Sequence, residues 1–229
     1  MTGSDMGRRV TLTATDGFQL SAWRADPAGK PRGGVIVVQE IFGVNAHICS
    51  VAEAYAAEGF VAVAPAIFDR IERDFEVAYD PAEYARGLDL AKRLDREKTL
   101  LDLAGAAREA GRGGKVGIVG YCLGGALAWL ASARLDGLSA AVGYYGGGIA
   151  AMIDLKPRAP TMLHFGEKDA HIPLEGVHKV AAAHPEVQVF TYPADHGFNR
   201  DVGKSYEPES AALAKARSVA FFAEHLAAS

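Results

Sequence analysis

The stretch VGYCLGGALAWL, residues 119–130, places a cysteine between glycines at the point where a strand should turn into a helix. Within it, GYCLG fits the Gly-x-nucleophile-x-Gly elbow, whose central residue occupies a tight, strained turn. The helix that follows would direct its dipole and free N–H groups at the side chain, which lowers the pKa of a thiol. Cys122 is therefore a candidate nucleophile, with the amide of Leu123 as an oxyanion donor. A single cysteine also packs commonly as a small apolar residue, so this hypothesis needs partners.

Two later strand ends supply such partners. An α/β-hydrolase carries its nucleophile, acid and histidine in that chain order. LHFGEKDAHIP ends one apolar run and offers Asp169, and TYPADHGFNR ends the next and offers His196. Glu167 is the nearest competitor for the acid, but Asp169 lies nearer the bend before the next helix. The alternatives are that Asp169 is a turn former or helix cap, and that His196 is a surface histidine.

A carboxylate follows the first core strand, in VVQEIFGVN. Glu40 at this edge should lie near Cys122, where it would hold the thiol neutral in the empty site. The amide of Ile41 can supply the second oxyanion donor, because the hole needs an N–H group at this position and no particular side chain. The alternative is an ordinary surface glutamate. His47, at the start of the next helix, is expected to be a capping or surface residue.

These residues need a sheet whose strands end at one edge. Continuous apolar, β-branched runs predict strands covered on both faces, at residues 33–40, 61–68, 115–122, 138–146, 160–169 and 187–193. Helical patterns alternate with them, at residues 45–59, 123–135, 174–185 and 209–228 and as one long helix within 82–111. The expected fold class is α/β, a mostly parallel central sheet flanked by helices on both faces, with an antiparallel hairpin over residues 8–27 at one edge. The irregular segment 69–87 is expected as a loop over the carboxyl ends of the strands, where ligands bind.

Composition narrows the class of protein. The 229 residues are 49% hydrophobic and 23% charged, which fits one domain over residues 1–229. A net charge of −4 with interspersed signs argues against nucleic acid as a partner. We expect no membrane span and no export signal, hence a cytoplasmic protein and, by default, a monomer. The two cysteines lack the spacing of metal ligands and are expected as single thiols.

Five motifs together resemble the dienelactone hydrolase (carboxymethylenebutenolidase) family, a cysteine branch of the α/β-hydrolase superfamily: QEIFGVN, GYCLGGALA, AVGYYG, GEKD and HGFNR. The similarity runs over nearly the whole chain. It implies that Cys122 is the nucleophile, His196 the base and Asp169 the residue that orients the base. It also implies that Glu40 deprotonates the thiol when substrate enters, that amides of residues 41 and 123 form the oxyanion hole, and that no metal or organic cofactor takes part.

In that family two arginines hold a substrate carboxylate, which suits the planar fork of a guanidinium group. Arg200 in HGFNR matches one of them. The other should come from the irregular segment, where Arg86 in DPAEYARG is preferred over Arg70 and Arg73. The alternatives are a solvated loop cation for Arg200 and an exposed helix face for Arg86. Tyr145 in VGYYGGG follows a strand and is expected to line the pocket.

The expected function is therefore hydrolysis of a small, carboxylate-bearing enol lactone through a cysteine acyl-enzyme. For the dienelactone, the product would be maleylacetate, a step in the degradation of aromatic compounds. The partner is then a small anionic lactone or ester. One alternative is a broader carboxylesterase or thioesterase with the same triad, which loss of the arginine pair would favour. Another is a non-catalytic α/β-hydrolase-like binding module, whose triad residues would lie too far apart to hydrogen-bond.

Overall fold

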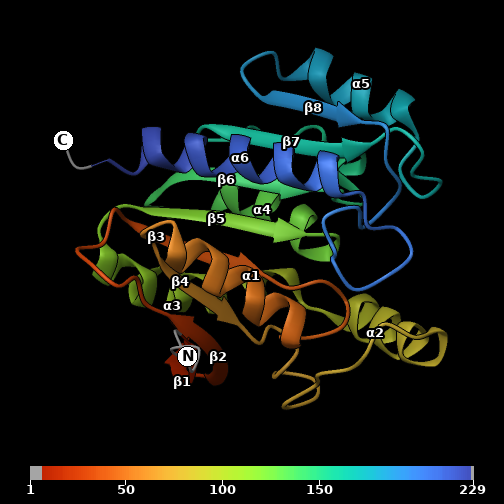
Figure 1. The fold of residues 1–229 in the computed structure, drawn as a ribbon. Helices are drawn as coiled ribbons and strands as arrows, with labels where there is room; N and C mark the ends of the chain where they lie inside the picture. Colours follow the sequence, from red (N-terminus) through yellow and green to blue (C-terminus); the bar gives the residue numbers. More distant parts are fainter. Residues whose placement is uncertain (1–6, 228–229) are drawn as a thin grey trace.

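One eight-stranded sheet runs through residues 7–227, the part of the chain that this computed structural model describes (Figure 1). Its strand order is β1-β2-β4-β3-β5-β6-β7-β8. The strands β3 to β8 are mutually parallel, and β1 and β2 form an antiparallel hairpin at one edge. The bounds of the strands are β1 Gly7–Thr13, β2 Gln19–Ala25, β3 Gly34–Val38, β4 Val61–Pro65, β5 Val116–Tyr121, β6 Leu138–Tyr144, β7 Thr161–Gly166 and β8 Gln188–Tyr192. The predicted mostly parallel sheet with an edge hairpin is confirmed.

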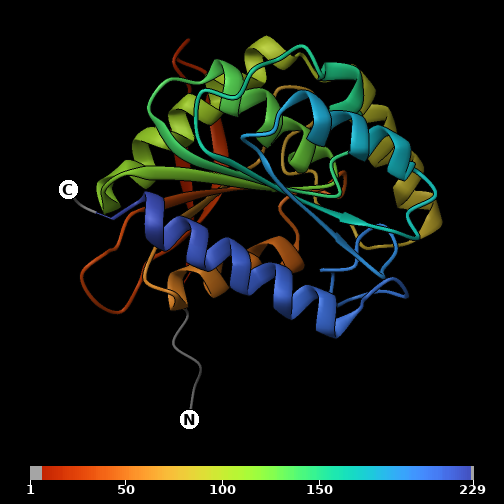
Figure 2. The same cartoon turned by 90° about the horizontal axis from the view of Figure 1, so that it is seen from above.

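Helices cover both faces of this sheet (Figure 2). Their bounds are α1 Ala46–Ala57, α2 Pro81–Arg93, α3 Arg96–Ala110, α4 Leu123–Arg134, α5 Leu174–Ala183 and α6 Pro208–His225. Alternate residues of β3 explain why two layers form: Val35 and Val37 pack with α1 and α6, whereas Ile36 and Val38 pack with α3 and α4. A strand with apolar residues on both faces must be covered twice. Among the described residues, no helix is both long and apolar enough to cross a membrane.

The predicted long helix within residues 82–111 is wrong in one respect, because two helices occupy that segment. The chain leaves the helical conformation at Leu94, whose ψ is 123°. Asp95 then caps α3 by accepting hydrogen bonds from the amides of Glu97 and Lys98, at 3.0 and 3.2 Å. An aspartate favours such a cap over a helix interior, since its short carboxylate competes for nearby backbone donors.

The segment 69–87 is also more regular than predicted, because α2 begins at residue 81. Asp80 caps this helix by accepting from the amides of Ala82 and Glu83, each at 3.0 Å. Residues before it remain irregular and pair with the loop after β3 through a bridge between Gly43 and Glu76. This segment therefore lies at the carboxyl edge of the sheet, as expected.

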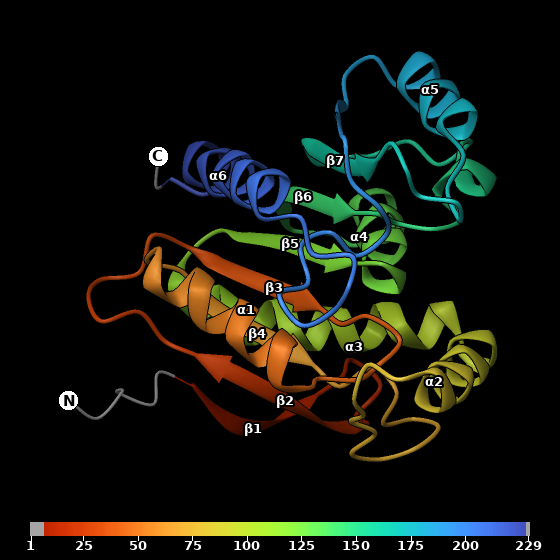
Figure 3. The ribbon, with the colours of Figure 1, turned by 45° about the vertical axis from the view of Figure 1, so that its right-hand side comes forward.

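Loops that follow β3, β4, β5, β7 and β8 meet at that edge (Figure 3). The loop between β8 and α6 passes in front of the ends of β3 and β5. Because parallel strands end at the same side, residues distant in sequence converge here. The candidate site is built at this convergence.

Candidate active site

The turn between β5 and α4 holds Cys122 in a backbone conformation that side-chain-bearing residues rarely adopt, with φ 53° and ψ −113°. Glycines make the turn possible: a Cβ on Gly120 would collide with the carbonyl of Gly124, and one on Gly124 with the carbonyl of Val38. The amide of Cys122 donates to the carbonyl of Tyr144 at 3.0 Å, which fixes the turn against β6. The geometry is that of a strained elbow with its side chain presented to a cavity.

His196 and Asp169 are hydrogen-bonded across the ends of β8 and β7. Nδ1 of His196 lies 2.7 Å from Oδ2 of Asp169. The other carboxylate oxygen accepts from the amide of His171 at 2.8 Å, so Asp169 is held from two sides. Because an ionised carboxylate only accepts, this bond places the proton of His196 on Nδ1 and leaves Nε2 to act on the thiol or substrate.

Burial and pairing compete in setting the pKa of both groups. Burial acts to lower the pKa of His196, but its interactions with Asp169 and Cys122 outweigh burial and raise the pKa to about 10. Burial acts to raise the pKa of Asp169, yet the hydrogen bond and charge of His196 hold it below its usual value. The pairing of His196 with Asp169 therefore favours the protonated, imidazolium form of His196.

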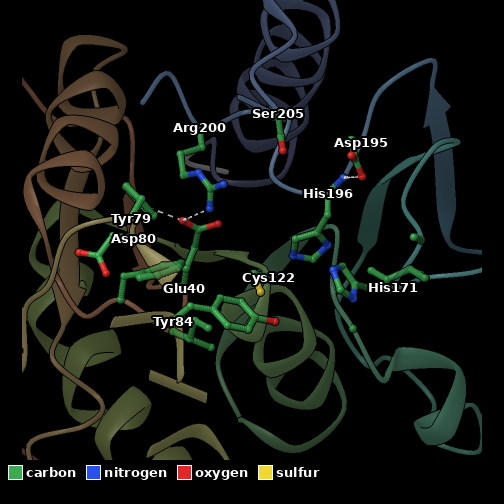
Figure 4. Close-up of a pocket in the computed structure, with 15 residues that line it drawn as sticks. Glu40, Tyr79, Asp80, Tyr84, Cys122, His171, Asp195, His196, Arg200 and Ser205 are labelled. Atoms are coloured by element: carbon green, nitrogen blue, oxygen red, sulfur yellow. Dashed lines mark hydrogen bonds and ion pairs between the residues drawn. The ribbon is translucent and has the colours of Figure 1, made fainter. Parts of the chain in front are cut away.

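Glu40 lies in the same cavity with its side chain 1% exposed. The hydroxyl group of Tyr79 donates to its Oε2 at 3.0 Å, and Nη1 of Arg200 lies 3.9 Å from the same oxygen. Figure 4 shows the carboxylate directed toward these two residues, with Cys122 between Glu40 and His196. The sequence analysis missed Tyr79. A tyrosine in an irregular segment has no motif, and its place beside Glu40 depends on the path of the loop.

The two residues expected to supply oxyanion donors follow neighbouring strands, β3 and β5. Ile41 follows Glu40 and lines the cavity. Leu123 is the first residue of α4, where a helix amide has no acceptor four residues earlier.

Of the arginines considered, Arg200 lines the cavity and Arg86 does not. The guanidinium carbon of Arg200 lies 4.4 Å from the centre of the Tyr79 ring. Arg86 instead pairs on the outer surface with Glu83 and Glu72, at 2.8 and 3.1 Å. The expectation for Arg86 is corrected here. On α2, residues two apart point in nearly opposite directions, and Tyr84 takes the cavity side.

The other two arginines are also engaged elsewhere. Arg70 is paired with Asp102 and Asp16, at 2.8 and 2.9 Å. Arg73 donates to the carbonyl of Gln19 at 2.9 Å. The cavity walls therefore carry one arginine among the described residues, where the resemblance implied two.

Tyr145 does not line the cavity, which corrects the expectation for this residue. Its side chain is fully buried, and its ring centre lies 5.1 Å from that of His196 and 5.4 Å from that of Phe198. The strand β6 ends one residue earlier, so the chain has already turned inward at this position. The ring of Tyr145 therefore packs against the ring of His196.

The cavity itself has a volume of about 650 Å³. Its walls combine the reactive groups with aromatic and aliphatic side chains: Glu40, Ile41, Cys122, His196 and Arg200 with Phe42, Tyr79, Tyr84, His171 and Ile172. Within residues 7–227, no cluster of three or more His, Cys, Asp or Glu side chains has the arrangement of a metal site. A thiol, a paired imidazole and backbone donors around one cavity can carry out acyl transfer.

Comparisons with known proteins show similarity over most of the chain. The model of the dienelactone hydrolase family matches residues 20–226. A protein of Azospirillum brasilense assigned to the carboxymethylenebutenolidases is 36% identical over 230 residues, covering 95% of this chain and 98% of its own. The carboxymethylenebutenolidase of Pseudomonas putida is 34% identical over 227 residues, covering 93% and 95%. A crystal structure from Klebsiella pneumoniae, assigned to the dienelactone hydrolases, has a TM-score of 0.82 at 32% identity and covers 95% of this chain and 99% of its own.

Proposed function

This chain belongs to the dienelactone hydrolase family and is a hydrolase of ester or lactone bonds, and we propose that Cys122 performs the hydrolysis as a nucleophile that forms an acyl-enzyme. The observation that carries the proposal is the strained elbow that presents Cys122 to the same cavity as the hydrogen-bonded pair of His196 and Asp169. A non-catalytic binding module would have no need of this pairing.

The reaction follows from these positions. The thiolate of Cys122 attacks the substrate carbonyl, and the amides of Ile41 and Leu123 stabilise the oxyanion that forms. The C–O bond then breaks, and the leaving oxygen takes the proton on Nε2 of His196. Neutral Nε2 next accepts a proton from the water molecule that attacks the thioester. The C–S bond breaks, the acid product leaves, and the thiolate takes back its proton from Glu40. Asp169 keeps the proton of the imidazole on Nδ1 throughout.

Glu40 activates the thiol in this proposal. In the empty site its carboxylate faces Tyr79 and Arg200. A substrate carboxylate that pairs with Arg200 competes for the cation, so Glu40 loses an electrostatic partner and can turn toward Cys122. It then accepts the thiol proton, and the nucleophile forms only when substrate is present. This order protects the thiol from oxidation in the absence of substrate.

The substrate that this site supports best is a small lactone with one carboxylate, such as the dienelactone, whose ring opening gives maleylacetate. Arg200 is the cavity cation for that carboxylate. A second candidate function is a broader carboxylesterase or thioesterase. The place of Arg86 outside the cavity and the aromatic wall of Phe42, Tyr79 and Tyr84 favour it, because fewer charges would then select the acyl group.

The test follows the loss of ultraviolet absorbance of the dienelactone with purified protein, beside 4-nitrophenyl acetate and beside the Cys122→Ala variant. Fast lactone opening that disappears in the variant would support both the substrate and the nucleophile. Slow lactone opening with Cys122-dependent cleavage of the acetate would support the broader esterase. Activity that survives Cys122→Ala on both substrates would refute the acyl-enzyme.

A further inference from the structure

A buried histidine outside the cavity contacts the loop that carries Arg200. His47 lies near the start of α1, and its side chain is 3% exposed, so the expectation of a surface residue is wrong. Its Nδ1 lies 2.9 Å from Oδ1 of Asp201. Because an ionised carboxylate only accepts hydrogen bonds, Nδ1 carries the proton and donates it to Asp201. Asp201 directly follows Arg200 in the chain.

The loop over residues 199–206 has few other polar anchors. Its ends are held by backbone bonds, from the amide of Arg200 to Gly197 and from that of Glu207 to Phe198, at 2.9 and 3.1 Å. Within the described chain, the polar side-chain contacts of this loop are those of Arg200 with Glu40 and of Asp201 with His47. The bond to His47 is therefore the tie between this loop and α1.

His47 also lies close to Tyr79, whose ring contacts the guanidinium group of Arg200. Its ring centre lies 6.1 Å from that of Tyr79, at an interplanar angle of 74°. The guanidinium carbon of Arg200 lies 4.4 Å from the centre of the same Tyr79 ring, whose hydroxyl group donates to Glu40. His47 thus contacts both the loop that supplies the cation and the aromatic ring that supports it.

We propose that His47, through Asp201, is a positioning residue for Arg200 and thereby sets the preference of the enzyme for anionic over neutral esters. The inference rests on the proposed role of Arg200 in binding a substrate carboxylate. An arginine side chain has many rotamers, and a guanidinium group that is displaced by about an ångström loses the geometry of a paired carboxylate. Tying the adjacent residue to a helix removes part of that freedom before substrate arrives.

The test compares two matched substrates, mono-4-nitrophenyl adipate and its methyl ester, which differ in one carboxylate and release the same chromophore. The measured quantity is the ratio of kcat/KM for the anionic ester to that for the neutral ester, after subtraction of spontaneous hydrolysis. We expect His47→Phe and Asp201→Ala each to lower this ratio about tenfold, mainly through KM of the anionic ester. The double variant should lose no more than either single variant, since both remove the same bond.

Two further variants make the result specific. His47→Asn places an amide donor near the position of Nδ1 and should restore most of the ratio. Asp136→Ala removes an exposed loop aspartate that accepts from Arg158 at 2.8 Å, far from the cavity lining, and should leave the ratio unchanged. Asp201 is 59% exposed, so Asp201→Ala carries the test if the His47 variants do not fold.

Arg200→Ala separates failure of this inference from failure of the proposed function. If Arg200→Ala lowers the ratio while His47→Phe and Asp201→Ala keep the wild-type value, the positioning role is refuted and the role of Arg200 stands. If Arg200→Ala leaves the ratio unchanged, the carboxylate-binding role of Arg200 fails, and the inference fails with it.

Discussion

The hydroxyl oxygen of Tyr79 lies 3.0 Å from Oε2 of Glu40 and donates its proton to that buried carboxylate. Burial and the negative charge of Glu40 raise the pKa of Tyr79, so the phenol stays protonated and remains a donor at neutral pH. Glu40 thus has a neutral donor on one side and Arg200 on the other. A carboxylate taken out of water depends on such partners, and removing one of them should be costly.

We therefore expect Tyr79→Phe to lower the free energy of unfolding by about 1–3 kcal/mol, the usual cost when a buried charged group loses a hydrogen bond. Urea unfolding at neutral pH measures it. Tyr84→Phe is the matched control, because Tyr84 lines the same cavity, is 44% exposed and makes no hydroxyl hydrogen bond among residues 7–227. An equal loss in both variants would contradict the contribution of the Tyr79 bond.

The two thiols should differ in reactivity. Burial, reinforced by nearby acidic groups, raises the pKa of Cys49 to about 11, so very little thiolate forms there at neutral pH. Cys122 opens onto the cavity beside His196. Iodoacetamide at pH 7.5 should label Cys122 at least about tenfold faster than Cys49, with parallel loss of esterase activity. Peptide mass spectrometry measures the labelling. As a control, iodoacetamide should inactivate the Cys49→Ala variant at the same rate as the wild type. Faster labelling of Cys49 would be the contrary result.

Asp169→Asn should lower kcat by about 10³- to 10⁴-fold, because an asparagine amide can reverse the tautomer of His196 and leave Nε2 protonated toward the thiol. Steady-state hydrolysis of 4-nitrophenyl acetate measures it. Glu167→Gln is the control: Glu167 accepts from the hydroxyl group of Thr191 at 2.9 Å, on the exposed side of the same loop. Similar activity losses in the two variants would show that Asp169 is not the specific partner of the base.

The raised pKa of His196 predicts a pH dependence of stability. Its pKa rises from an ordinary value of 6.5 to about 10 in the folded protein, so the folded state favours the imidazolium. The resulting stabilisation is complete below about pH 6.5 and is lost as pH rises toward 10. The free energy of unfolding of the wild type relative to His196→Asn should therefore fall between pH 6.5 and 9.5. Urea titrations at four pH values measure this difference, and a constant difference would disprove the linkage.

The backbone strain at Cys122 predicts that a glycine there is more stabilising than an alanine, which is the reverse of the usual order inside a helix. At φ 53° and ψ −113°, Cys122→Gly should be more stable than Cys122→Ala by about 1 kcal/mol, because glycine adopts this conformation without a Cβ clash. Cys49 lies inside α1, where Cys49→Gly should be less stable than Cys49→Ala by about 1 kcal/mol. Thermal unfolding of the four variants checks the two opposite signs. The same order at both positions would mean that the elbow stores no strain.

The strands that carry the site could be predicted because each strand is marked by a local run of apolar residues in the sequence. Each apolar run ends next to its polar residue, and parallel strands bring Cys122, Asp169 and His196 to one edge whatever the details of the loops. The break between α2 and α3 was missed, because one long helix was predicted within residues 82–111, whereas the side chain of Asp95 caps a new helix.

Contacts set by loop paths could not be predicted in the same way. Tyr79 meets Glu40 across 39 residues, and His47 meets Asp201 across 154. Arg86 was preferred over Arg70 and Arg73 because the stretch DPAEYARG resembles the family pattern, whereas the phase of α2 decides that Tyr84 faces the cavity. A single sequence carries no signal for partners of this kind.

The place of β8 in the sheet affects how the enzyme should respond to heat. Among the described strands, β8 pairs with β7 alone and is partly exposed along its length, whereas β5 is buried between two neighbours. Cys122 thus follows a strand in the middle of the sheet, whereas His196 follows the edge strand β8. Fraying of one marginal strand separates base from nucleophile while the core stays intact. We therefore expect heating to abolish activity when this edge strand frays, before the rest of the molecule melts.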